Sequence, residues 1–537
     1  MERDASFPGP HFRETWLLAI VAALSAIVVF RGALGGFFGQ DDFVGLARAR
    51  GLLPVLPFPW RWISGQLYFV FMRPFGTDSA LAYHAVNLAA HALTAALLAR
   101  VLARRVGAPA ALIGAIFFAA HPAHFTALYS VSGVGELLAP LFALAALDVS
   151  MRRDRWRWLA PALFALALLC KENLLLLPAL LLLPDGWLGG RDADGARASN
   201  IDRRGTVLAL GIVSVVMAAL IALADPFGTR AALPESAAYA WSMGPHVLGN
   251  LGTYAAWTVN FALPAVRSVS DSIDPGATPV ALAALALWIA GLMWPALRRR
   301  GWLAGGLTWL AFLLPVLALP HHTYHYYLHA PLLGAALCVS ALADALFAGD
   351  RTRRVEHDAP RAKGMKGRAA PAWGIAAIAA VLLVVNGAAL VSKIESYPFT
   401  LPGLRADATV DRGRIARAAR DDLRSAQLPP GVALRFWSPT SIRIEIETHP
   451  QSDPLRRETY WEQNVRTALY DGLGVRVLFP EVGGVRFVRE YTPAPDSVRY
   501  ALYEPDGRVA VLTSSGIDSL LGARGSRTRP AAPQARR

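Results

Sequence analysis

The stretch Gln40-Asp41-Asp42-Phe43 comes directly after the first long apolar run of the chain, Trp16 to Phe38. Charged side chains are expensive inside a bilayer, so they are kept there for function or placed at its edge. These two carboxylates fall where a first membrane helix would emerge into water. Because adjacent carboxylates repel, one of them can hold its proton more tightly than an isolated Asp does. The pair is therefore either a proton acceptor for a substrate hydroxyl or an ordinary loop pair that caps a short helix beginning at Asp42.

The composition places the rest of the chain in a membrane. Of the 537 residues, 54% are hydrophobic and only 17% are charged. Soluble proteins of this length are usually more charged, and here the apolar residues form long runs. We expect an all-α polytopic membrane protein with about eleven transmembrane helices. The formal net charge is +14, but the arginines cluster in short loops between apolar runs. They indicate membrane topology and contacts with lipid phosphates, and we expect no nucleic-acid partner.

The positions of the Arg clusters predict the orientation of the spans. If each cluster lies in the cytoplasm, the Asp41 loop is outside and a last span, Trp373 to Val391, delivers the tail to the outside. This requires the segment Pro245 to Ala262 to remain outside as an interfacial or re-entrant helix. In the first outer loop we expect a second interfacial helix, Ile63 to Met72. That loop breaks the charge trend because it holds four arginines, which an anionic ligand would explain.

The tail, Ser392 to Arg537, has a different composition. We expect three parts in the chain: a transmembrane domain over 1–391, a small α+β domain outside the membrane over 392–522, and a disordered basic tail over 523–537. Within the second domain we expect helices near Asp411 to Gln427 and Arg456 to Tyr470. Alternating runs predict strands at Val432 to Phe436, Ser441 to Ile446, Val475 to Leu478 and Val485 to Val488.

Polar side chains gather at the predicted outer ends of the spans, on the same side as Asp41. On the second span, His84, Asn87 and His91 are spaced three and four residues apart and therefore share one helix face. Taken singly, such residues are ordinary interfacial hydrogen-bonding groups or simple ion pairs. Their convergence favours one outward-facing cavity. Its expected lining is His84, Asn87, His91, Glu136, His246, Asn250 and Trp257.

In this arrangement the chain resembles the GT-C glycosyltransferases that use a polyprenyl-phosphate sugar. It is most similar to the branch around protein O-mannosyltransferases, the transmembrane TPR O-mannosyltransferases and their bacterial relatives. The resemblance covers roughly Trp16 to Phe347. It rests on the order and spacing of Asp41-Asp42, His84-x-x-Asn87-x-x-x-His91, Phe118-Ala-Ala-His121-Pro122-x-His124, Gly133-x-x-Glu136 and Cys170-Lys171-Glu172 with Pro178 following.

The resemblance implies an inverting transfer of a sugar from a polyprenyl-phosphate donor to a hydroxyl of a protein, lipid or envelope glycan outside the membrane. Asp41, first in the acidic pair, would be the general base, and Asp42 would orient it. Cations near the phosphate would stabilise the leaving charge. The expected donor-binding residues are Arg61, His121, His124, Lys171, Glu172 and His325. The implied location is a bacterial inner membrane, with the active site and the tail on the outer face.

Two departures from the family pattern fall at the donor site. The relatives often carry an Arg where this chain has Val134, and an Arg-Tyr-x-Tyr-Leu-Pro motif where this chain reads Tyr324-His325-Tyr326-Tyr327-Leu328-His329. Both remove a guanidinium that would bind phosphate. We therefore expect His325, His329, Lys171 or a first-loop Arg to replace it. No TPR array follows the last span.

Cofactors and rival functions remain open at this point. We assign no metal ligands and leave a divalent metal open, since some of the resembled proteins work without metal. His321, His322, His325 and His329 have the number and spacing to bind Zn²⁺. A transporter or flippase of a lipid-linked or anionic solute would also use intramembrane histidines, but we see no inverted repeat. A third alternative is a non-catalytic GT-C-like membrane protein that senses ligands through its tail.

Overall fold

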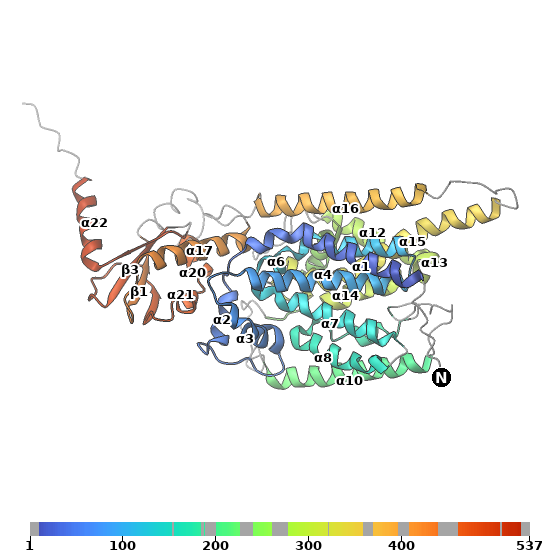
Figure 1. Cartoon of the computed structure of the whole chain (residues 1–537), viewed down its shortest axis with the longest axis horizontal. Helices are drawn as coiled ribbons and strands as arrows, with labels where there is room; N and C mark the ends of the chain where they lie inside the picture. The colour runs from blue at the N-terminus through green and yellow to red at the C-terminus, as the bar shows by residue number, and fades with distance from the viewer. Residues whose placement is uncertain are drawn as a thin grey trace, which may run out of the picture. The chain divides into compact units, whose positions relative to one another are not determined.

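A computed structural model describes residues 10–152, 155–183, 187, 200–225, 240–259, 278–320, 322–357, 369–395, 407–438, 460–504 and 507–527 (Figure 1). The chain forms two compact units. The first contains residues 1–35, 55–71 and 82–396, and the second contains residues 36–54, 72–81 and 397–537. Two stretches of the first outer loop thus belong to the same unit as the tail, which the sequence had not predicted.

The first unit is a bundle of helices that run side by side (Figure 1). Its longer helices are α1 (Pro10–Phe30), α4 (Leu81–Ala103), α5 (Ala108–Ala120), α7 (Val134–Ser150), α8 (Ala160–Cys170), α10 (Asn200–Ala224), α11 (His246–Val259), α12 (Thr278–Met293), α14 (Trp302–Leu317), α15 (Pro331–His357) and α16 (Ala369–Glu395). The shorter ones are α3 (Tyr68–Met72), α6 (Phe125–Tyr129), α9 (Leu177–Leu180) and α13 (Pro295–Arg299).

Five described helices are long and apolar enough to cross a membrane, and a sixth span results if α5 and α6, which meet at a 41° bend, are counted as one. The bend follows His121-Pro122, because a proline cannot continue the hydrogen bonding of the preceding helix. Three shorter apolar helices, α12, α14 and part of α15, add to these. The chain is therefore a multi-pass membrane protein, and the count of eleven spans stays a prediction.

Small residues allow the central helices of the bundle to approach closely, as is usual in membranes. A Cβ on Gly305 of α14 would lie 2.6 Å from the carbonyl oxygen of Gly334 on α15, and a Cβ on Gly334 would lie 2.3 Å from that of Gly305. On α5, a Cβ on Gly114 would lie 2.6 Å from the carbonyl oxygen of Ala336. These contacts fix α15, and the polar segment just before it, against α5 and α14.

Two helices expected from the sequence are present in the first unit. The segment Ile63 to Met72 is a π-helical turn, η2 (Ile63–Leu67), followed by α3, and the described part of Pro245 to Ala262 is α11. After α8, the described residues contain the short helix α9, which has Pro178 in its first turn and is followed by turns through Leu182.

The second unit combines helices with one small sheet. Its sheet has the order β2-β1-β3-β4, with β1 parallel to β2 and β3, and β4 antiparallel to β3. The strands are β1 (Ala433–Trp437), β2 (Gly484–Phe487), β3 (Val498–Tyr503) and β4 (Val509–Leu512), and the helices are α2 (Asp42–Ala49), α17 (Ala408–Ser425), α20 (Tyr460–Ala468), α21 (Leu473–Leu478) and α22 (Ser514–Arg527). Helix α17 starts where the Asp407 side chain accepts a hydrogen bond from the Thr409 N–H at 2.9 Å.

One prediction for the tail is wrong. Val475 to Leu478 is not a strand but part of α21, because Gly472 takes φ +87° at the start of that helix, a conformation that favours glycine. A Cβ at Gly472 would also lie 2.7 Å from Val485. Helix α22 runs through Arg527, and the disorder expected for residues 523–537 stays a prediction. The strand expected at Ser441 to Ile446 lies outside the described residues.

Candidate active site

The Asp41-Asp42 pair lies at the start of α2, and the two carboxylates have different surroundings. Asp42 is buried, with 2% of its surface exposed, and its Oδ2 accepts a hydrogen bond from the Gly39 N–H at 3.1 Å. Asp41 is exposed, and within the described residues its carboxylate has no hydrogen-bond donor. One carboxylate thus holds the turn together while the other is open to a ligand.

The turn that carries the pair is anchored to the tail helices of its own unit. Gln40 takes φ +50°, a conformation that costs energy for a residue with a Cβ. Its N–H donates to the carbonyl of Ala468 at 2.9 Å, and its side-chain oxygen accepts from the Arg412 guanidinium. A Cβ on Gly39 would lie 3.1 Å from backbone atoms of Arg412 and Gly413. These contacts fix the backbone from which Asp41 projects.

The electrostatics of this turn favour a proton acceptor. Burial of the carboxyl group raises the pKa of Asp41 above its ordinary value of 3.8, although the residue as a whole keeps an exposed surface. The Asp42 carboxylate raises this pKa further, and the Arg412 guanidinium lowers it. A carboxylate with a raised pKa is a stronger base, which is what removing a proton from a hydroxyl requires.

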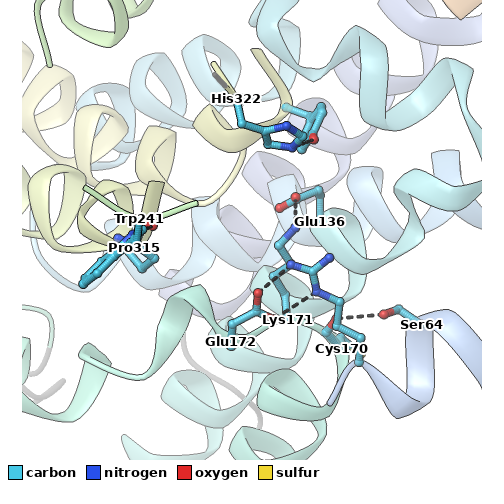
Figure 2. Close-up of polar contacts among 10 residues, drawn as sticks. Ser64, Glu136, Cys170, Lys171, Glu172, Trp241, Pro315 and His322 are labelled. Carbon is cyan, nitrogen blue, oxygen red and sulfur yellow. Dashed lines mark hydrogen bonds and ion pairs between the residues drawn. The ribbon is translucent and has the colours of Figure 1, made fainter. Parts of the chain in front are cut away.

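In the first unit, four charged residues form two ion pairs where η2, α7 and the end of α8 meet (Figure 2). Arg61 binds Glu172 through two hydrogen bonds, Nε to Oε2 at 3.1 Å and Nη2 to Oε1 at 2.5 Å. Lys171 pairs with Glu136, and both side chains are buried. Nearby, the Ser64 hydroxyl donates to the Cys170 carbonyl at 2.7 Å. The two cations expected at the donor phosphate are therefore each paired with a carboxylate of this chain.

Aromatic rings cover the Lys171 ammonium from the segment before α15. Its Nζ lies 5.8 Å from the centre of the Tyr326 ring and 5.3 Å from that of Tyr327, within the range of cation–π attraction. The Tyr326 hydroxyl lies 3.3 Å from His322 Nε2 (Figure 2). The tyrosine-rich segment before α15 is thus next to the ion pairs.

Two residues of the predicted cavity lining, His84 and Asn87, and one predicted donor-binding residue, His121, contact backbone carbonyls. His84 Nδ1 lies 3.0 Å from the Leu128 carbonyl, and the Asn87 amide donates to the carbonyls of Ser130 and Val131 at 3.2 and 3.3 Å. His121 Nε2 lies 3.2 Å from the Thr258 carbonyl. These contacts are the ones expected of ordinary hydrogen-bonding residues at helix ends.

Three polar or aromatic side chains of α11 contact neighbouring segments. The Asn250 amide donates to the carbonyls of Leu317 and Leu319 at 2.9 and 3.1 Å, and Trp257 stacks on His325 with ring centres 3.8 Å apart. His246 is half-buried and lies 3.0 Å from the Ser242 carbonyl. These contacts hold α11 against α14 and the segment before α15.

Three further histidines, His91, His124 and His329, meet elsewhere in the same unit and are fully buried. The sequence analysis placed His91 in the cavity lining and His124 at the donor site, and it grouped His329 with its neighbours His321, His322 and His325. His321 is outside the described residues.

Sequence reasoning missed the anchoring roles of Gln40, Arg412 and Ser64. Arg412 follows Gln40 by more than 370 residues, so no local spacing could reveal the contact. A charged residue in an otherwise ordinary amphipathic helix gives no signal of its own.

Comparisons with known proteins found a distant likeness to solved structures. No family model matches the chain, and no curated protein matches it. One similar solved structure is the archaeal oligosaccharyltransferase AglB from Archaeoglobus fulgidus in complex with an inhibitory peptide and a dolichol-phosphate: 12% identity, TM-score 0.42, covering 78% of this chain and 62% of that one. Another is the Archaeoglobus fulgidus oligosaccharyltransferase tethered to an acceptor peptide: 14% identity, TM-score 0.39, covering 79% of this chain and 62% of that one.

Both similar structures are archaeal oligosaccharyltransferases. The chain spans less than two thirds of the length of either structure. At these identities and TM-scores, we draw no inference from them about donor, acceptor or site residues.

Proposed function

We propose that this protein is an inverting membrane glycosyltransferase that moves a sugar from a polyprenyl-phosphate donor to an acceptor hydroxyl outside the membrane. The observation that carries the proposal is the division of roles within the acidic pair. Asp42 is buried and bonded to Gly39, whereas Asp41 is exposed, lacks a hydrogen-bond donor among the described residues and has a raised pKa. A fixed turn thus presents one carboxylate as a base.

In the proposed reaction, Asp41 accepts the proton of the acceptor hydroxyl as the hydroxyl oxygen attacks C1 of the sugar. The bond between C1 and the phosphate oxygen breaks, polyprenyl phosphate leaves with the electron pair, and the configuration at C1 inverts. The donor lipid supplies the free energy, so the reaction needs no nucleotide. The acceptor is a hydroxyl of a protein, a lipid or an envelope glycan.

Arg61 and Lys171 are the proposed phosphate-binding residues. The Arg61 guanidinium already binds two oxygens of one carboxylate, Glu172, and the same fork geometry fits two oxygens of a phosphate. Lys171 would act as a point charge beside it. His121, His124 and His325 were also expected to bind the donor. In our proposal His325, which stacks on Trp257, contributes to donor binding through that ring. His121 and His124 instead support the packing of the helix bundle.

We place this activity in residues 1–391, with residues 392–522 as the domain outside the membrane, and we locate the protein in a bacterial inner membrane. The distribution of Arg clusters supports the orientation. A periplasmic reporter fused after Val391 should be active, and a reporter that works only in the cytoplasm would reverse the orientation.

Donor turnover by the purified protein tests the function. The protein, reconstituted in lipid vesicles, is given polyprenyl-phosphate hexoses together with an extract of envelope proteins and glycans, and released polyprenyl phosphate is measured. We expect release that requires the acceptor extract and that Asp41→Asn abolishes. Movement of the intact lipid between leaflets without release of polyprenyl phosphate would favour the transporter alternative instead.

A further inference from the structure

Three histidines from distant parts of the chain meet in the interior of the first unit. His91 lies on α4, His124 lies on the short 3-10 helix η4 (Pro122–His124), and His329 follows the 3-10 helix η8 (His325–Leu328). All three are 0% exposed. Their ring centres are 4.6, 5.3 and 4.2 Å apart, and one nitrogen of each lies within 4.8 Å of the others.

The backbone fixes the tautomer of two of these rings. His91 Nε2 lies 3.0 Å from the Ala119 carbonyl, and His124 Nε2 lies 2.8 Å from the Phe118 carbonyl. A carbonyl oxygen only accepts, so each Nε2 carries the hydrogen and donates. In a neutral imidazole the other nitrogen, Nδ1, then has a free lone pair. This is the arrangement in which histidines bind metals, with one nitrogen held by the protein and the other available as a ligand.

The remaining nitrogens of the cluster have no partner within the described residues. These are Nδ1 of His91, Nδ1 of His124 and both ring nitrogens of His329. A neutral His329 supplies a single N–H, so it could satisfy at most one of the two Nδ1 lone pairs. Buried polar atoms are normally bonded, and each exception calls for an explanation. A metal ion among the three rings would satisfy one lone pair of every histidine at once.

We propose that His91, His124 and His329 form a binding site for one late first-row transition metal ion, zinc or copper. Neutral imidazole suits both metals. Zinc–nitrogen bonds of about 2.0–2.1 Å place tetrahedral ligand atoms about 3.3–3.5 Å apart, so small rotations of the rings would close the site. The site is distinct from the ion pairs of Arg61 and Lys171 and does not depend on the proposed transfer reaction.

The surroundings point to a structural ion. The edges of Phe30 and Phe118 lie against the rings, with the Phe118 centre 4.7 Å from that of His124. A fourth histidine, His121, is engaged elsewhere, since its Nδ1 accepts from the Ala123 N–H at 3.2 Å and its Nε2 faces Thr258. Because all three rings are fully buried, substrate has no route to the ion, which distinguishes it from a catalytic metal that is open to solvent. The ion would tie α4, η4 and the start of α15 together.

Metal analysis of the full-length protein tests the proposal. The protein is purified through a tag that contains no histidine and without chelators, and its zinc and copper are measured by mass spectrometry. We expect about one ion per chain, and loss of at least about tenfold in His124→Gln and His329→Gln, which remove a ligand. His84→Gln, a buried histidine on the same helix as His91 but outside the cluster, is the matched control and should keep the ion.

A second measurement tests the site even if a variant does not fold. Wild-type protein stripped by a chelator is titrated with Zn²⁺ or Cu⁺, and uptake and thermal unfolding are followed. Uptake of about one equivalent with a rise in Tm supports the site, and the ion that binds more tightly identifies the metal. The proposal is overturned if neither ion binds stoichiometrically, or if His329→Gln binds as much metal as the His84→Gln control.

Discussion

The backbone N–H of Gly39 donates a hydrogen bond to Oδ2 of Asp42 across 3.1 Å, so the buried member of the acidic pair is bonded within its own turn. Its neighbour Asp41 remains exposed. Two identical side chains in adjacent positions therefore have different surroundings, and we propose that one supports the structure of the turn and the other the chemistry.

The structural role of Asp42 should be measurable as a change in protein stability. Asp42→Ala should lower the free energy of unfolding of the second unit by about 1.5–3 kcal/mol, the range for a hydrogen bond to a charged group. Asp41→Ala changes an exposed residue and should stay within about 0.5 kcal/mol. Thermal unfolding in detergent compares the two. Equal losses in both variants would contradict the division of roles.

The pH dependence of transfer should reflect the raised pKa of Asp41. A general base works as the carboxylate, so the rate should rise with pH through that pKa, and the acid limb should lie above 3.8. Arg412 lowers this pKa, so Arg412→Gln should move the limb to higher pH, while Arg412→Lys keeps the charge and should leave it near the wild-type position. An acid limb that moves to lower pH in Arg412→Gln would show that another group is the base.

Variants of the Lys171–Glu136 pair distinguish an effect on stability from an effect on donor binding. Removing one partner of a buried ion pair costs about 3–5 kcal/mol because the other charge is left uncompensated. Lys171→Met and Glu136→Gln should each destabilise the first unit, and the double variant should recover most of that loss. Donor binding should stay weak in both variants that lack Lys171, as measured with polyprenyl phosphate. Wild-type affinity in the double variant would remove Lys171 from the donor site.

Packing of the Asp41 turn against α17 depends on Gly413. A Cβ there would lie 2.9 Å from the carbonyl oxygen of Phe37, so Gly413→Ala should destabilise the second unit by about 1–3 kcal/mol, as overpacking does. Gly211 lies in α10 with no atom within 4 Å of its added Cβ. Gly211→Ala is the matched control and should stabilise by about 0.5–1 kcal/mol. Thermal unfolding of both variants tests this prediction. Equal changes in stability would contradict the close approach of Gly413 to Phe37.

Much of the fold was predictable because apolar runs and helix periodicity are local signals. The helices near Asp411, Pro245 and Ile63 follow from such patterns, and so does β1. The error at Val475 arose because a short apolar alternation fits one turn of helix as well as a strand, and the positive φ of Gly472 decides between them. Strands β3 and β4 were missed because their pairing depends on contacts between distant segments.

The candidate site was predictable only where spacing carried the signal. The shared face of His84, Asn87 and His91 is a matter of helix geometry, but whether each binds a backbone carbonyl or another histidine depends on tertiary packing. His91 and His329 are more than 200 residues apart, so their meeting has no local signature. The pairing of Arg61 with Glu172 likewise joins two segments whose proximity the sequence does not encode locally.

The most direct test of the central claim is the rate of sugar transfer by Asp41→Asn at saturating donor. Asn keeps the volume of Asp but cannot accept a proton as a carboxylate does. We predict a loss of about 10²- to 10⁴-fold, the usual cost of removing a general base, with nearly unchanged donor binding and a smaller loss in Asp42→Asn. An Asp41→Asn variant that transfers sugar at close to the wild-type rate would contradict the account.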